Sequence, residues 1–127
     1  MRGPLPVTWS HQPILNAFVA ISTDPEPLDG IFQALDEILK HPKGGGRMRI
    51  LVDHKHPPTT AMVGEGLARL LSYLGRIEGS TIVLVLPGDG DFGIGRLATL
   101  MLGGTVDIEV FNDMPSAVVS LTMDEQD

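Results

Sequence analysis

The chain has no cysteine, so disulfide bonds, thiolate catalysis and zinc–thiolate sites are excluded. Aromatic residues are few, with four Phe, one Tyr and one Trp, so aliphatic side chains and methionine must fill the core. No apolar run reaches the roughly 18 residues that a membrane-spanning helix needs. The segment Met1-Arg2-Gly3-Pro4-Leu5-Pro6 lacks the apolar stretch of a secretory signal. We therefore expect no membrane insertion and a cytoplasmic location.

Basic residues are also scarce, with 9 Lys and Arg against 16 Asp and Glu, which gives a formal charge of −7. Such a surface repels phosphate backbones and anionic lipids, so we predict no nucleic-acid partner. The 127 residues, 43% of them hydrophobic, are typical of one globular domain. We place this domain at residues 1–127, with a core at about 6–121 and an acidic tail at 122–127.

The hydrophobic pattern alternates between strand-like and helix-like segments, centred on a βαβ unit at residues 81–111. Strands are predicted at 6–11, 14–22, 48–53, 81–86 and 105–111. Helices are predicted at about 25–41, 59–75, 93–102 and 113–121. The order ββαβαβαβα indicates an α/β fold with a mixed, mostly parallel five-stranded sheet and helices packed on it.

A glycine-rich turn, Gly88-Asp89-Gly90-Asp91-Phe92-Gly93, follows the fourth predicted strand and matches the GxGxxG dinucleotide pattern. Its two aspartates would repel a pyrophosphate, and the pattern lies in the last βαβ unit rather than the first. We interpret it as a tight turn that lets the next helix lie close to the sheet. The alternative is a nucleotide-binding protein or small enzyme that uses this turn.

The segment Asp53-His54-Lys55-His56 follows the third predicted strand, and its two histidines could share a face. A metal site needs three or four ligands, and only two can be named here. We therefore expect surface loop histidines and no bound metal. No serine has the flanking pattern of a nucleophile, so we predict no catalytic residues and no cofactor.

Two further segments carry candidate functional residues. Thr59 and Thr60 stand at a helix start, where either could be the N-cap or, alternatively, a phosphorylation site. In the helix at 93–102, Leu100 widens the apolar stripe, and we expect the final helix to cover it; a partner surface or pocket wall is the alternative. Arg96 is expected to pair with a nearby acid, with anion binding as the alternative.

The chain resembles bacterial STAS/SpoIIAA-like proteins across residues about 14–121. The resemblance is carried by three stretches, Leu51-Val52-Asp53, Ile82–Pro87 with Phe92-Gly93-Ile94-Gly95-Arg96, and Val106–Ala117. It implies a mixed sheet flanked by helices, in agreement with the predicted element order. Related anti-anti-sigma factors have Asp-Ser-Ser-Gly after the central strand, whereas here Asp53 is followed by His54-Lys55-His56, without the phosphoacceptor. The final helix has Ser120-Leu121 in place of the family's Trp-Leu.

The resemblance also implies binding of apolar ligands, which is associated with one branch of the family. We therefore expect a regulatory or binding module, not an enzyme, that engages a protein partner, a second copy as a homodimer, or a small apolar ligand. A phosphorylation-controlled switch is the third option. The candidate surface lies at the carboxyl ends of the strands. Its residues are Asp53, His54, Thr59, Thr60, Gly88, Phe92, Arg96 and Leu100.

Overall fold

The computed structural model describes residues 7–44, 47–87 and 94–125. Its elements are β1 (Val7–Gln12), β2 (Ala17–Ser22), α1 (Leu28–Lys40), β3 (Arg49–His54), α2 (Thr60–Leu71), α3 (Leu74–Ile77), β4 (Thr81–Val85), α4 (Ile94–Leu102), β5 (Asp107–Phe111) and α5 (Met114–Glu125). The α/β class and the five-stranded mixed sheet are confirmed. None of the helices in these ranges is long and apolar enough to cross a membrane.

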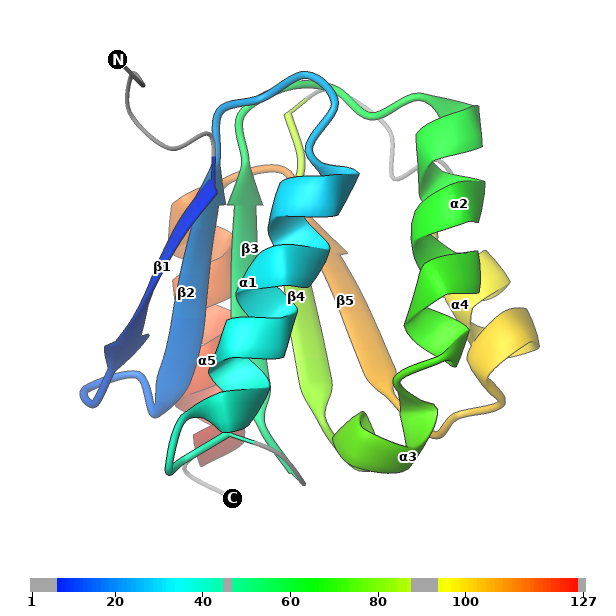
Figure 1. The fold of residues 1–127 in the computed structure, drawn as a ribbon. Helices are drawn as coiled ribbons and strands as arrows, with labels where there is room; N and C mark the ends of the chain where they lie inside the picture. The colour runs from blue at the N-terminus through cyan, green and yellow to red at the C-terminus, as the bar shows by residue number, and fades with distance from the viewer. Residues whose placement is uncertain (1–6, 45–46, 88–93, 126–127) are drawn as a thin grey trace, which may run out of the picture.

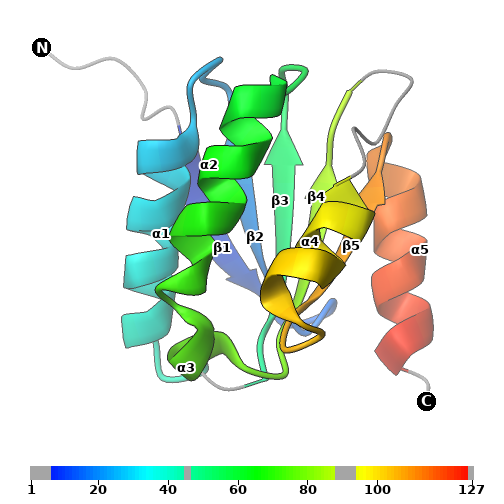
Figure 2. The same cartoon turned by 90° about the vertical axis from the view of Figure 1, so that its right-hand side faces the viewer.

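The strands lie side by side in chain order, β1-β2-β3-β4-β5 (Figure 1). The β1–β2 pair is antiparallel, joined by a turn in which Asn16 adopts a left-handed φ of 51°. The other three pairs are parallel. Because right-handed crossovers between successive neighbours all return on the same side, α1, α2 and α4 share one face of the sheet. Figure 2 shows α5 alone on the opposite face.

Alternate residues of each strand face the two helical layers, which gives two separate cores. The larger core joins the α1, α2 and α4 side chains to sheet residues such as Ile50, Val52 and Ile82. The smaller core lies under α5, where Ala117 and Leu121 are fully buried. Neighbouring positions of one strand therefore face different helices.

Side-chain hydrogen bonds cap the N-termini of α2 and α5. Thr59 is the N-cap of α2, because its hydroxyl accepts a hydrogen bond of 3.1 Å from the backbone N–H of Met62. Asp113 accepts a bond of 2.8 Å from the Ser116 N–H at the start of α5. Before α1, Asp24 accepts from the Glu26 N–H, and the N-cap residue Pro27 makes no side-chain cap hydrogen bond.

The predicted second helix is wrong at its C-terminal end. It extends to residue 75 in the prediction but stops at Leu71, and the short helix α3 follows. Ser72 donates its hydroxyl to the Arg69 carbonyl, 2.8 Å away, which occupies a carbonyl at the end of α2. Gly75, at the predicted end of the helix, lies inside α3.

Candidate functional site

A cavity of about 150 Å³ lies between α1, α2 and the sheet. It arises because the two helices pack on different neighbours: α1 lies on β1 and β2, whereas α2 packs against α4. Val52 and Leu84 form part of the floor. Leu35 of α1 and Val63 and Leu67 of α2 form part of the walls. The separation of the helices leaves space over β3 and β4 that their side chains do not fill.

Polar contacts between the two helices cross the outer side of this space. Arg69 of α2 donates to Asp29 of α1 at 2.9 Å, and its guanidinium lies 4.6 Å above the ring of Phe32. Tyr73, which follows α2, donates its hydroxyl to Asp36 of α1 at 2.7 Å. The rings of Phe32 and Tyr73 stack with centroids 5.5 Å apart. These contacts join the helices on the solvent side of the cavity.

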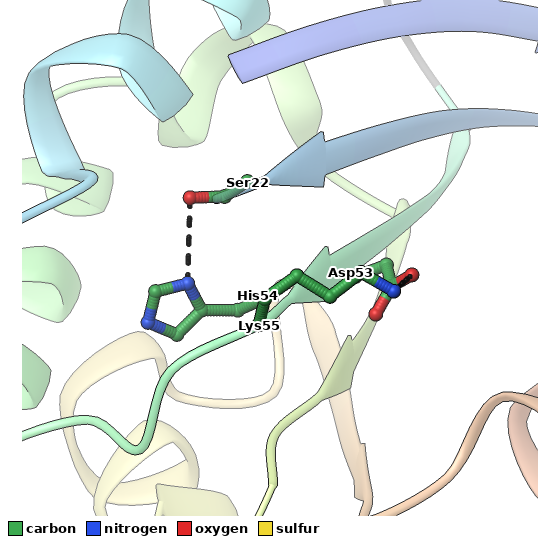
Figure 3. A network of polar contacts seen from close by, with 4 residues as sticks. All are labelled: Ser22, Asp53, His54 and Lys55. Carbon is green, nitrogen blue, oxygen red and sulfur yellow. Dashed lines mark hydrogen bonds and ion pairs between the residues drawn. The ribbon is translucent and has the colours of Figure 1, made fainter. Parts of the chain in front are cut away.

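His54, the last residue of β3, is the polar side chain in the described cavity lining. It follows Ile50 and Val52 on the same face of the strand and is 3% exposed. Its Nδ1 lies 3.4 Å from the hydroxyl of Ser22 at the end of β2, a long contact (Figure 3). Its Nε2 has no hydrogen-bond partner among the described residues. Leaving such a group unsatisfied costs about 1–3 kcal/mol.

The electrostatics of the cavity end favour a neutral imidazole. Burial and the nearby His56 lower the pKa of His54 below its ordinary value, and the carboxylates of Asp53 and Asp24 oppose this shift. His56 itself is half-buried, with Nε2 2.9 Å from the carbonyl oxygen of Thr23. The expectation that both histidines lie on the surface is therefore wrong for His54. Within residues 7–44, 47–87 and 94–125, no group of three or more His, Asp and Glu could hold a metal.

The other predicted residues at the ends of β3 and α2 do not join His54 at the cavity. Asp53 lies on the opposite face of β3 and accepts a hydrogen bond from Lys55 at 2.6 Å, on the far side of the strand from the His54 ring (Figure 3). Thr59 is engaged as the N-cap of α2, which confirms one of the two interpretations of that pair. Thr60 is the first residue of the helix and is exposed.

The remaining predicted residues belong to the turn at 88–93 and to α4. Gly88 and Phe92 lie outside the described residues. Arg96 is exposed, and no acid in the described ranges forms an ion pair with it. Leu100 is 76% exposed, so the expectation that the final helix covers it is wrong. The reason is topological: α4 and α5 lie on opposite faces of the sheet (Figure 2).

Sequence reasoning missed Ser22, Phe32 and Arg69 as parts of the site. It also ended the third strand at Asp53, one residue early. The alternation of Ile50, Val52 and His54 was the signal that the histidine continues the inward-facing row. By contrast, Arg69 and Asp29 are 40 positions apart in the chain, and no local pattern joins them.

No protein-family model, curated protein or solved structure matches the chain. Membership of the STAS/SpoIIAA-like family therefore stays a prediction based on the residues quoted above.

Proposed function

We propose that the protein is a binding module for a small apolar molecule, held in the cavity between α1, α2 and the sheet. The observation that carries this proposal is the chemistry of the lining. Apart from His54, the described lining residues are all apolar or glycine. Apolar cavities of about 150 Å³ remain dry and bind molecules the size of benzene. An apolar solute would gain contacts that the lining side chains lack without it.

A small molecule fits this cavity better than a segment of a partner protein. An inserted helix or strand would have to break the contacts that Arg69 and Tyr73 make with α1. The volume of about 150 Å³ also limits the part of the occupant inside the cavity to about the size of benzene. The STAS/SpoIIAA-like resemblance, which we propose as the family assignment, supports a binding role independently of the cavity.

Two glycines of α2 offer a matched test of cavity binding. A Cβ atom at Gly66, which lines the cavity, would lie 3.3 Å from Leu28 Cδ2. A Cβ atom at Gly64 would meet nothing within 4 Å. We expect Gly66→Leu to fill the cavity and abolish benzene binding, whereas Gly64→Leu leaves it unchanged. Binding is measured by titrating the folded protein with benzene and following methyl resonances of Val52 and Leu84 in NMR spectra.

The proposal is wrong if wild-type protein shows no saturable benzene-dependent shift of these resonances. Equal loss of binding in the two leucine variants would also contradict it, because Gly66 lines the cavity and Gly64 does not.

Three other functions stay predictions, one of which is a phosphorylation-controlled switch at Thr59 or Thr60. A protein partner or homodimer is favoured by the exposed Leu100 on α4. Concentration-dependent sedimentation that Leu100→Asp removes would support that function. The nucleotide or enzyme alternative depends on the turn at residues 88–93. A saturable rise in melting temperature with NAD, ATP or GTP would favour it.

A further inference from the structure

We propose that the ligand is an amphiphile whose polar head accepts a hydrogen bond from Nε2 of His54 while its apolar part fills the cavity. This inference rests on the proposed function and specifies the class of molecule bound. The head is a carboxylate or a carbonyl group, and the apolar part is about the size of a short alkyl chain or a single ring.

The first step in this inference is the uneven distribution of polarity along the cavity. His54 stands at the carboxyl end of β3, and the rest of the described lining is apolar. A purely apolar ligand would leave the imidazole Nε2 without a partner in a water-poor environment. A ligand with one polar end would satisfy this atom and still place its apolar portion against Val52 and Leu84.

The second step is the direction of the hydrogen bond, which we infer from the position of Ser22. Ser22 is fully buried, and its hydroxyl hydrogen needs an acceptor. The side-chain acceptor beside it is Nδ1 of His54, at 3.4 Å (Figure 3). If the serine donates to Nδ1, a neutral imidazole carries its own proton on Nε2. The free nitrogen is then a donor, and the ligand must present an acceptor.

The third step concerns the charge that the cavity end tolerates. Lys55 is turned to the opposite face, where it pairs with Asp53, so it does not supply a cation to the ligand. His56 lies nearby, with ring centroids 6.2 Å from His54, and its Nε2 contacts the Thr23 carbonyl. Asp24 is the remaining charged neighbour. A carboxylate head would therefore form an ion pair only with the protonated, positively charged form of His54. A carbonyl head needs only the N–H at Nε2 of the neutral ring.

The test compares matched ligands on matched variants. Wild type, His54→Leu and the control His56→Leu are titrated with hexanoate, 2-hexanone and benzene at about pH 7, and dissociation constants are measured by NMR. We expect His54→Leu to weaken hexanoate or 2-hexanone at least about tenfold. It should change benzene binding by less than about twofold, because benzene makes no hydrogen bond. The control His56→Leu should leave 2-hexanone and benzene, whose binding does not depend on the charge of His54, within about twofold of wild type.

The two polar ligands, hexanoate and 2-hexanone, distinguish a carboxylate head group from a carbonyl head group. A loss confined to hexanoate assigns a carboxylate, whereas a loss that extends to 2-hexanone assigns a neutral acceptor. If benzene binds and His54→Leu changes all three ligands equally or not at all, the head-group inference is overturned while the proposed function stands. If benzene does not bind to wild type, the proposed function and the head-group inference are both wrong.

A second measurement needs no variant. The ¹⁵N and ¹H resonances of the His54 ring report which nitrogen carries the proton. We expect the proton on Nε2 in the free protein and a shift of the Nε2 resonance on addition of hexanoate or 2-hexanone. A proton on Nδ1, with a bare Nε2, would overturn the inference, because the ligand would then have to be a donor.

Discussion

The guanidinium of Arg69 in α2 lies 2.9 Å from the carboxylate of Asp29 in α1. The same group lies 4.6 Å above the ring of Phe32, one turn further along α1. One side chain therefore contacts α1 twice, across the space where the two helices separate to form the cavity. Arg69 is not itself a lining residue of the cavity, but Phe32, which its guanidinium covers, is.

The first prediction concerns Arg69→Met. Because the Asp29 side chain is 99% exposed, the ion pair adds little stability, and we expect a loss of less than about 1 kcal/mol in urea unfolding. Exchange of bound benzene should become faster, because one contact across the cavity edge is gone. The control Asp29→Asn removes only the charge pair. A stability loss above about 2 kcal/mol, or unchanged exchange, would contradict this view of Arg69.

The second prediction separates the two threonines at the start of α2. Thr59→Ala removes the side-chain acceptor for the Met62 N–H and should lower the free energy of unfolding by about 0.5–2 kcal/mol. Thr60→Ala is the matched control, because Thr60 is exposed and alanine has a higher helix propensity. Denaturant unfolding measures both. Equal losses would show that the cap does not stabilise the helix in solution.

The third prediction compares two leucines of α4. Leu102 is 2% exposed and belongs to the larger core, so Leu102→Ala should cost about 2–5 kcal/mol in chemical denaturation. Leu100 is 76% exposed, and Leu100→Ala should stay within about 0.5 kcal/mol of wild type. A large loss for Leu100 would indicate that another surface covers it in solution, such as a second copy of the chain.

The element order could be predicted from the sequence because each helix and strand carries its own periodicity. The stripe that includes Ile31, Leu35 and Ile38 identifies α1 without reference to the rest of the chain. The faces of the sheet could not be assigned in this way. The strand order places α4 on the same face as α1 and α2, whereas α5 follows the last strand and packs on the other face, which leaves Leu100 exposed (Figure 2).

The candidate site was predicted only in part, for a related reason. The end of β3 and the start of α2 were predicted to be part of a binding surface, and His54 was among the residues named there. The cavity itself depends on how far apart α1 and α2 lie, and no local signal in either helix gives that distance. Long-range contacts such as Arg69–Asp29 and Ser22–His54 appear only once the chain is folded.

The fourth prediction is a pH dependence of stability caused by His54. Its pKa in the folded protein lies below the ordinary value of 6.5, because of burial first and His56 second. As the pH falls through about 6.5, the unfolded chain therefore takes up the proton before the folded protein does. The stability contribution of neutral His54 is present above that pH and decreases below it. His11, whose pKa is lowered by burial, Lys43 and His41, acts in the same direction.

We therefore expect wild type to lose more free energy of unfolding than His54→Leu between about pH 7.5 and about pH 5, measured by urea denaturation at each pH. His11→Leu is the control, since it removes the other histidine with a lowered pKa and leaves the His54-dependent loss in place. Saturating hexanoate should reduce that loss, because a carboxylate beside Nε2 favours the imidazolium and raises its pKa in the folded protein. Parallel pH curves for wild type and His54→Leu would show that the imidazole is not held neutral by its burial.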